Sequence, residues 1–106
     1  MQDHHLFVYV TAPAAEAAPL CETLVRERLA ACAHIVAGAQ SIYWWNGALE
    51  RATESVCVLK TTQDRFEALR LRIRELHSYE TPCIVALPIS AGDKDFLAWI
   101  QRETTA

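Results

Sequence analysis

The spacing of hydrophobic positions changes early in the chain from a period of two to the period of a helix. Over residues 6–11 the alternation predicts a β-strand with both faces in use. After a turn at Ala12-Pro13, apolar residues recur every three or four positions, which indicates a helix. Because proline is not tolerated in a helix interior, Pro19 predicts that the regular helix begins near Ala18. Its apolar stripe comprises Ala17, Leu20, Cys21, Leu24, Val25, Leu29 and Cys32.

Two long strands joined by a tight turn are predicted in the middle of the chain. The runs 35–45 and 48–61 flank Asn46-Gly47, a pair that favours a type I′ turn because both central positions need positive φ. Gly38 predicts a bulge in the first of the two strands. Strands in globular proteins usually have about five or six residues. We therefore expect part of this hairpin to project beyond the sheet.

A second helix, an edge strand and a short third helix complete the pattern. The second helix is expected to open at Asp64, with Glu67 completing a capping box. Residues 83–89 form the expected fourth strand, which Pro88 places at a sheet edge. Asp93 is expected to cap the third helix. The side chains expected to point inward are Phe66, Leu69, Ile73 and Leu76 in the second helix and Phe96, Leu97 and Ile100 in the third.

The order of these elements predicts an α+β fold. It matches the ferredoxin-like βαββαβ sandwich, with an extended central hairpin and an added C-terminal helix. The chain has 106 residues, which suits a single domain over residues 1–106. Because this fold hosts many unrelated functions, it does not by itself define an activity.

Charge and composition narrow the classes of partner. The formal net charge is −3 and the basic residues are dispersed, whereas nucleic-acid binding needs a clustered positive face. No segment approaches the roughly 20 apolar residues that span a bilayer. The first five residues are polar and lead directly into a strand, unlike a signal peptide. We therefore expect a cytoplasmic protein without a nucleic-acid or membrane partner.

Three aromatic residues, Tyr43, Trp44 and Trp45, stand directly before the predicted turn. The tip of a projecting hairpin has little of its own chain to bury them against. Trp and Tyr are enriched at the cores of protein interfaces, so the aromatic run favours assembly with another copy. The alternative is that one Trp lies under the hairpin while the other is simply exposed.

The four cysteines show no CxxC spacing and stand among apolar positions. We expect free thiols that are mostly buried, with Cys21, Cys32 and Cys57 in the core. Cys32 lies two residues from His34, a pair too small for a closed metal site. The adjacent His4 and His5 are either a weak copper or nickel site or part of a disordered terminus.

His77 is the strongest single candidate for metal chemistry. It lies at a predicted helix C-terminus, where the helix dipole favours imidazolium. A metal site needs three or four ligands, and Cys83 is the one further ligand nearby. Other copies of the chain would have to supply the rest. The alternative is a histidine that caps the helix or is solvated.

Lys60 is a candidate for binding an anion. It precedes a predicted helix N-terminus, whose free N–H groups favour negative charge. The alternative is a solvated lysine at a strand end. The sequence contains no nucleotide-binding, metalloprotease or serine-hydrolase signature, so its motifs do not predict an enzyme.

Seven strings in register carry a resemblance to the CutA family of divalent-cation tolerance proteins. It extends from about Val8 to Glu103, and it implies a compact cytoplasmic homotrimer of ferredoxin-like subunits, similar in architecture to PII signalling proteins. Lys60, Tyr79 and Glu80 resemble the family's residues at clefts between subunits. The strings are Val10–Pro13, Arg28–Cys32, Ser41–Gly47, Leu59–Thr62, His77–Pro82, Ala86–Ile89 and Phe96–Ile100. Ser78 and Cys83 stand where the family usually has Pro and Glu.

Three functions follow as hypotheses. The first is a trimeric divalent-cation tolerance protein, not an enzyme, that binds metal ions such as copper through His77. The second is a PII-like regulatory module that binds a small anion at inter-subunit clefts through Lys60, Tyr79 and Glu80. The third is an enzyme in the same clefts, with Lys60 and Glu80 as acid and base.

Overall fold

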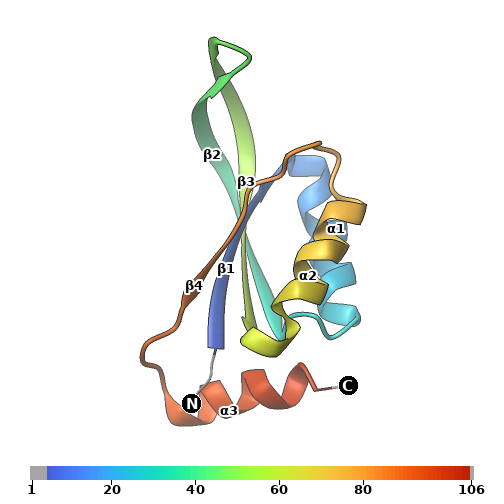
Figure 1. Cartoon of the computed structure of the whole chain (residues 1–106), viewed down its shortest axis with the longest axis vertical. Helices are drawn as coiled ribbons and strands as arrows, with labels where there is room; N and C mark the ends of the chain where they lie inside the picture. The colour runs from blue at the N-terminus through green and yellow to red at the C-terminus, as the bar shows by residue number, and fades with distance from the viewer. Residues whose placement is uncertain (1–4, 106) are drawn as a thin grey trace.

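A four-stranded antiparallel sheet carries two helices on one face and a third helix across one end (Figure 1). The computed structural model describes residues 5–105. The strands stand in the order β2-β3-β1-β4, which confirms the predicted ferredoxin-like arrangement. The elements are β1 (His5–Ala12), α1 (Ala14–Arg26), β2 (Cys32–Trp45), β3 (Ala48–Thr62), α2 (Gln63–Leu76), β4 (Ile84–Pro88) and α3 (Lys94–Glu103).

The core lies between the sheet and the helices α1 and α2. Alternate side chains of β1 are buried there, as the period of two predicts. Each large apolar side chain that is fully buried contributes roughly 1.5–3 kcal/mol to stability. The opposite face of the sheet has no such cover from α1 and α2 (Figure 1). Core side chains with no exposed surface include Val8, Val10, Leu24, Leu59, Leu69 and Ile73.

The hairpin of β2 and β3 confirms the predicted turn and bulge. Asn46 and Gly47 have φ angles of 50° and 79°, both positive as a type I′ turn requires. The strand register shifts between Val36 and Ala39, where Gly38 has a φ of 82°. The hairpin projects beyond the rest of the sheet (Figure 1), and the longest molecular dimension is 44 Å against 25 and 22 Å.

The predicted start of the first helix is wrong. α1 begins at Ala14 and carries Pro19 in its second turn. Pro19 has no N–H to donate to the helical carbonyl one turn before it. Because Pro19 is exposed, water can bind that carbonyl instead. The helix ends at Arg26 because Arg28 adopts a positive φ of 62°, and the Leu29 N–H then donates to the Leu24 carbonyl.

Because α1 ends there, Cys32 begins β2 and does not extend the helical stripe, contrary to the prediction. The capping box predicted for α2 is also wrong. Thr62 is the N-cap residue and its side chain makes no cap hydrogen bond. Glu67 pairs instead with Arg70, with 2.6 Å between carboxylate oxygen and guanidinium nitrogen. The strand β3 runs directly into the helix, which leaves no separate cap residue at Asp64.

The C-terminal elements agree more closely with the pattern. β4 is an edge strand, as predicted, and it spans Ile84–Pro88 within the predicted residues 83–89. The Asp93 carboxylate accepts a hydrogen bond of 3.0 Å from the Phe96 N–H and so caps α3. Two side chains predicted to point inward are partly exposed instead, Leu76 at 38% and Phe96 at 41%. No helix among residues 5–105 is both long and apolar enough to cross a membrane.

The cap of α3 gives a first prediction. Asp93→Ala removes the acceptor for the Phe96 N–H and should lower the free energy of unfolding by about 1 kcal/mol. Asp95→Ala is the matched control, because Asp95 lies in the first turn but is not the cap residue. Urea unfolding at one protein concentration measures both variants. Equal losses in the two would show that the cap hydrogen bond is not the cause.

Candidate functional site

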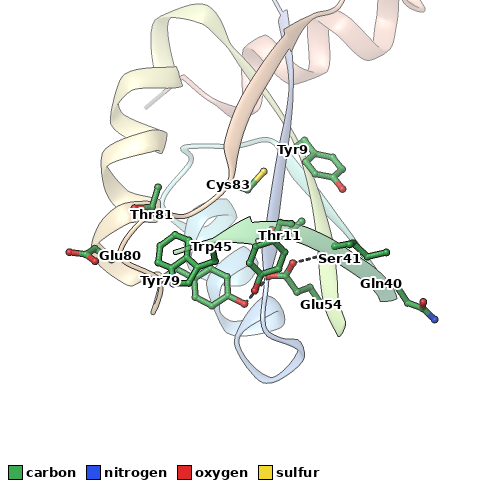
Figure 2. A pocket seen from close by; sticks show the side chains of 12 residues that line it. Tyr9, Thr11, Gln40, Ser41, Trp45, Glu54, Tyr79, Glu80, Thr81 and Cys83 are labelled. Carbon is green, nitrogen blue, oxygen red and sulfur yellow. Dashed lines mark hydrogen bonds between the residues drawn. The ribbon is translucent and has the colours of Figure 1, made fainter. Parts of the chain in front are cut away.

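A cleft of about 720 Å³ opens where the hairpin leaves the sheet (Figure 2). Its walls come from β1, β2, β3 and the loop between α2 and β4. Both hydrogen-bonding and aromatic side chains face it. The residues that line the cleft are Tyr9, Thr11, Gln40, Ser41, Ile42, Tyr43, Trp45, Glu54, Tyr79, Glu80, Thr81 and Cys83.

Glu54 is the buried acidic group of this cleft. The residue is 5% exposed, and its two carboxylate oxygens accept hydrogen bonds from the Ser41 hydroxyl at 2.5 Å and the Tyr79 hydroxyl at 2.8 Å (Figure 2). Among residues 5–105 no Lys, Arg or His forms an ion pair with it. A buried carboxylate that lacks a cationic partner favours the approach of a cation.

The Asn46-Gly47 turn places Ser41 on the face of the sheet that holds Glu54, because the length of the turn fixes the register of the hairpin. The register pairs Ala39 with Glu54 and Ser41 with Ala52, which places Ser41 diagonal to Glu54 on one face. Tyr43 and Trp45 follow on the same face of β2.

Tyr79 joins the loop after α2 to this carboxylate. Partial burial, followed by the hydrogen bond to Glu54, raises the pKa of Tyr79 to about 12. The Tyr79 N–H also donates to Nδ1 of His77 at 3.1 Å, and the two rings lie 4.7 Å apart. The phenol therefore stays neutral and keeps its donor proton at physiological pH.

His77 is 8% exposed and is held by backbone groups on both sides. Its Nε2 lies 2.7 Å from the Thr11 carbonyl, which can only accept, so Nε2 donates while Nδ1 accepts from Tyr79. In this arrangement neither nitrogen has a free lone pair for a metal. The metal role of His77 stays a prediction, and it requires the ring to exchange one of these bonds for the metal.

The other predicted residues separate into two groups. Tyr79, Glu80 and the exposed Cys83 line the cleft together. Lys60 is not among the lining residues; its Nζ lies 5.8 Å from the Phe7 ring centroid and 5.9 Å from that of Phe96, beside α3. The structure therefore brings together two of the three predicted cleft residues within one chain.

The cysteines follow the prediction in part. All four are free thiols, and Cys21 and Cys57 are buried as expected. The hydrogen bond between these two thiols, followed by burial, raises the pKa of Cys21. Cys32 is half-buried and Cys83 is exposed, so the expectation of mostly buried thiols is wrong for these two. Over residues 5–105 no three His, Cys, Asp or Glu side chains are grouped to hold a metal ion.

Glu54 and Ser41 were not found from the sequence. A signal exists for Glu54, because it stands inside a predicted strand shortly before the apolar run 56–59. A carboxylate at such a position either faces solvent or has partners on neighbouring segments. The predicted turn fixes the register that places Ser41 beside Glu54, but the sequence pattern does not place the Tyr79 loop against that carboxylate.

The contact between Tyr79 and Glu54 predicts a late ionisation of one tyrosine. Ultraviolet titration of the folded protein should show one phenol ionising near pH 12, absent in Tyr79→Phe. Glu54→Gln should lower that pKa part of the way, because burial of the phenol remains. The folded state holds this proton more tightly than the unfolded state, so stability should fall as pH rises between about 10 and 12. A normal titration of all three tyrosines would contradict the contact.

Comparisons with known proteins agree with this architecture. The family described as CutA1 divalent ion tolerance protein matches residues 6–103. The divalent-cation tolerance protein CutA of Archaeoglobus fulgidus is 43% identical over 99 residues, covering 92% of this chain and 96% of the relative.

Solved structures superpose over almost the whole chain. The divalent cation tolerance protein of Thermus thermophilus is 41% identical with a TM-score of 0.92, covering 95% of this chain and 99% of the other. CutA from Xylella fastidiosa is 33% identical with a TM-score of 0.94, covering 97% and 100%. The chain belongs to the CutA1 family of divalent ion tolerance proteins.

Proposed function

We propose that this chain is a cytoplasmic, non-catalytic divalent-cation tolerance protein that works as a homotrimer and binds divalent metal ions such as Cu²⁺. The observation that carries the proposal is the charge of the cleft. Glu54 and Glu80 supply two carboxylates and Cys83 a thiol, while no basic side chain lines the cleft within the described part of the chain. Such a set favours a cation.

The charge of the cleft also decides between the two binding hypotheses. A PII-like site for a small anion needs positive charge or free backbone N–H groups. Lys60, the residue predicted to supply that charge, lies beside Phe7 and Phe96 and does not line the cleft of its own chain. We therefore favour metal over an anionic ligand.

Exposed apolar side chains support assembly. In the hairpin, Trp44 is 74% exposed, Ile42 55% and Trp45 49%. On β4, Val85 and Leu87 are 51% and 55% exposed on the face that α1 and α2 do not cover. Large apolar surfaces of this kind mark protein interfaces. Three copies is the number that the family resemblance implies.

Assembly gives a prediction for the hairpin. Light scattering at micromolar concentration should give the mass of a trimer. Trp44→Ala or Trp45→Ala should weaken the trimer by about 2 kcal/mol or more if that residue is a hot spot. A matched control is Leu71→Ala, which truncates an exposed apolar residue on α2 instead of the hairpin. A monomeric wild type would overturn the proposal.

Metal binding requires ligands from more than one copy. One chain provides no group of three ligating side chains within residues 5–105. His77 is the imidazole that the proposal assigns to the metal, and binding there costs one of its two backbone hydrogen bonds. We therefore propose weak binding, micromolar or poorer, with the ligand set completed between subunits.

Calorimetry with Cu²⁺ tests this proposal. All proteins carry His4→Gln and His5→Gln, because this pair is the other copper site proposed from the sequence, and the substitutions keep the backbone of His5 in β1. His77→Gln should lower the affinity about tenfold or more. An amide nitrogen can still donate to the Thr11 carbonyl, so this variant keeps the structural role that His77→Ala would lose. Light scattering checks that the trimer persists.

His34→Gln is the matched control, since His34 is exposed and does not line the cleft. An unchanged affinity in His77→Gln would show that His77 is a structural residue. If copper binds neither to the parent protein nor to His77→Gln while the trimer is intact, the metal proposal as a whole is overturned.

A further inference from the structure

The Glu54 carboxylate has a geometry that favours an external counter-ion. It is withdrawn from water, yet both hydrogen bonds that it accepts come from neutral hydroxyls, those of Ser41 and Tyr79. Neither hydroxyl carries a positive charge, so these hydrogen bonds do not neutralise the carboxylate. Each carboxylate oxygen retains a second acceptor position. The charge is therefore available to a cation that enters the cleft.

Aromatic side chains form part of the walls of the cleft that holds this charge. Four side chains that line the cleft are aromatic, and Figure 2 labels three of them, Tyr9, Trp45 and Tyr79. Tyr43 is the fourth. A ring face attracts a cation within about 6 Å of its centroid, and Trp does so most strongly. A carboxylate in a cleft lined by several aromatic rings suits an organic cation.

The size of the cleft leaves room for an organic cation. Its volume of about 720 Å³ falls within the range of small-molecule pockets, roughly 300–1,000 Å³. The metal of the proposed function needs ligands from more than one copy, because residues 5–105 of one chain group no three ligating side chains. An organic cation needs only the Glu54 carboxylate and the aromatic side chains that line the cleft of one chain.

We propose that this cleft binds a small organic ammonium ion, with Glu54 as the counter-charge and Trp45 and Tyr79 as its aromatic walls. The inference rests on the proposed preference of the cleft for cations and adds an organic cation to the metal ion. A quaternary ammonium group suits the site best because it donates no hydrogen bond. It therefore needs only the charge and the ring faces, while both hydroxyl donors remain on Glu54.

Choline and a neutral analogue of the same shape test the inference. The analogue is the alcohol in which carbon replaces the nitrogen of choline, so the two probes differ in charge alone. Full-length protein treated with EDTA is titrated with each probe while tryptophan fluorescence and heat are recorded. Choline should bind saturably, and the neutral alcohol at least about tenfold more weakly.

Two cleft variants and one control locate the site. Glu54→Gln removes the charge and Trp45→Leu removes a ring, so each should weaken choline binding about tenfold or more. Trp44→Leu is the control, because Trp44 belongs to the same aromatic run but does not line the cleft. Light scattering compares the masses of all three variants. If Trp45→Leu alters the assembly, choline binding by Glu54→Gln alone tests the inference.

The outcomes separate this inference from the proposed function. Equal binding of choline and the neutral alcohol would overturn the inference, because the site would then be merely apolar. Equal weakening by Trp44→Leu and Trp45→Leu would also overturn it. If choline does not bind while Cu²⁺ binds to the same protein, the inference fails and the metal proposal stands. If neither binds, both fail.

Discussion

The hydrogen-bonded carboxylate of Glu54 is the interaction on which the candidate site depends. It takes one donor from β2 through Ser41 and one from the loop after α2 through Tyr79. Tyr79 in turn donates its backbone N–H to His77, which donates to the Thr11 carbonyl on β1. One chain of hydrogen bonds thus connects three strands with the loop. Loss of any member leaves a buried polar group without its partner, which costs about 1–3 kcal/mol.

The hairpin turn and one backbone irregularity together set which side chains share a face. The Asn46-Gly47 turn fixes an unbroken register from Trp45↔Ala48 to Ala39↔Glu54, which puts Ser41, Tyr43 and Trp45 on the face of Glu54. The extra residue at Gly38 reverses the alternation for Cys32–Val36 at the other end of β2, and its positive φ is a conformation that glycine adopts at least cost. The turn therefore determines the partners of Glu54 on β2, whereas the bulge determines which face the base of that strand presents to the core.

The sequence predicted features whose cause is local. The Asn46-Gly47 turn, the Gly38 bulge, the Asp93 cap and the edge position of Pro88 each follow from the backbone preferences of one or two residues. The order of the elements predicted the ferredoxin-like arrangement and with it the strand order. The turn, the bulge and the cap of α3 were inferred correctly without a structure, whereas the cap of α2 was not.

The failures have a different cause. The helix continues through Pro19 because burial of the neighbouring Ala17, Leu20 and Cys21 stabilises it. The one hydrogen bond that proline removes does not break it. Glu54 was missed because its partners lie on another strand and a distant loop. The turn fixes the register that brings Ser41 to Glu54, whereas Tyr79 reaches the carboxylate through the tertiary placement of a distant loop.

The aromatic run of the hairpin had two interpretations, assembly with another copy and packing of one Trp under the hairpin, and the structure makes them compatible. Trp45 lies on the face of β2 that lines the cleft, whereas its neighbour Trp44 points to the other face and is 74% exposed. Alternation along one strand therefore divides adjacent aromatics between two tasks. Trp44 is exposed for contact with another copy, while Trp45 lines the same cleft as Glu54. In the proposed trimer, the hairpin therefore contributes one aromatic side chain to the assembly alone and the next to the cleft as well.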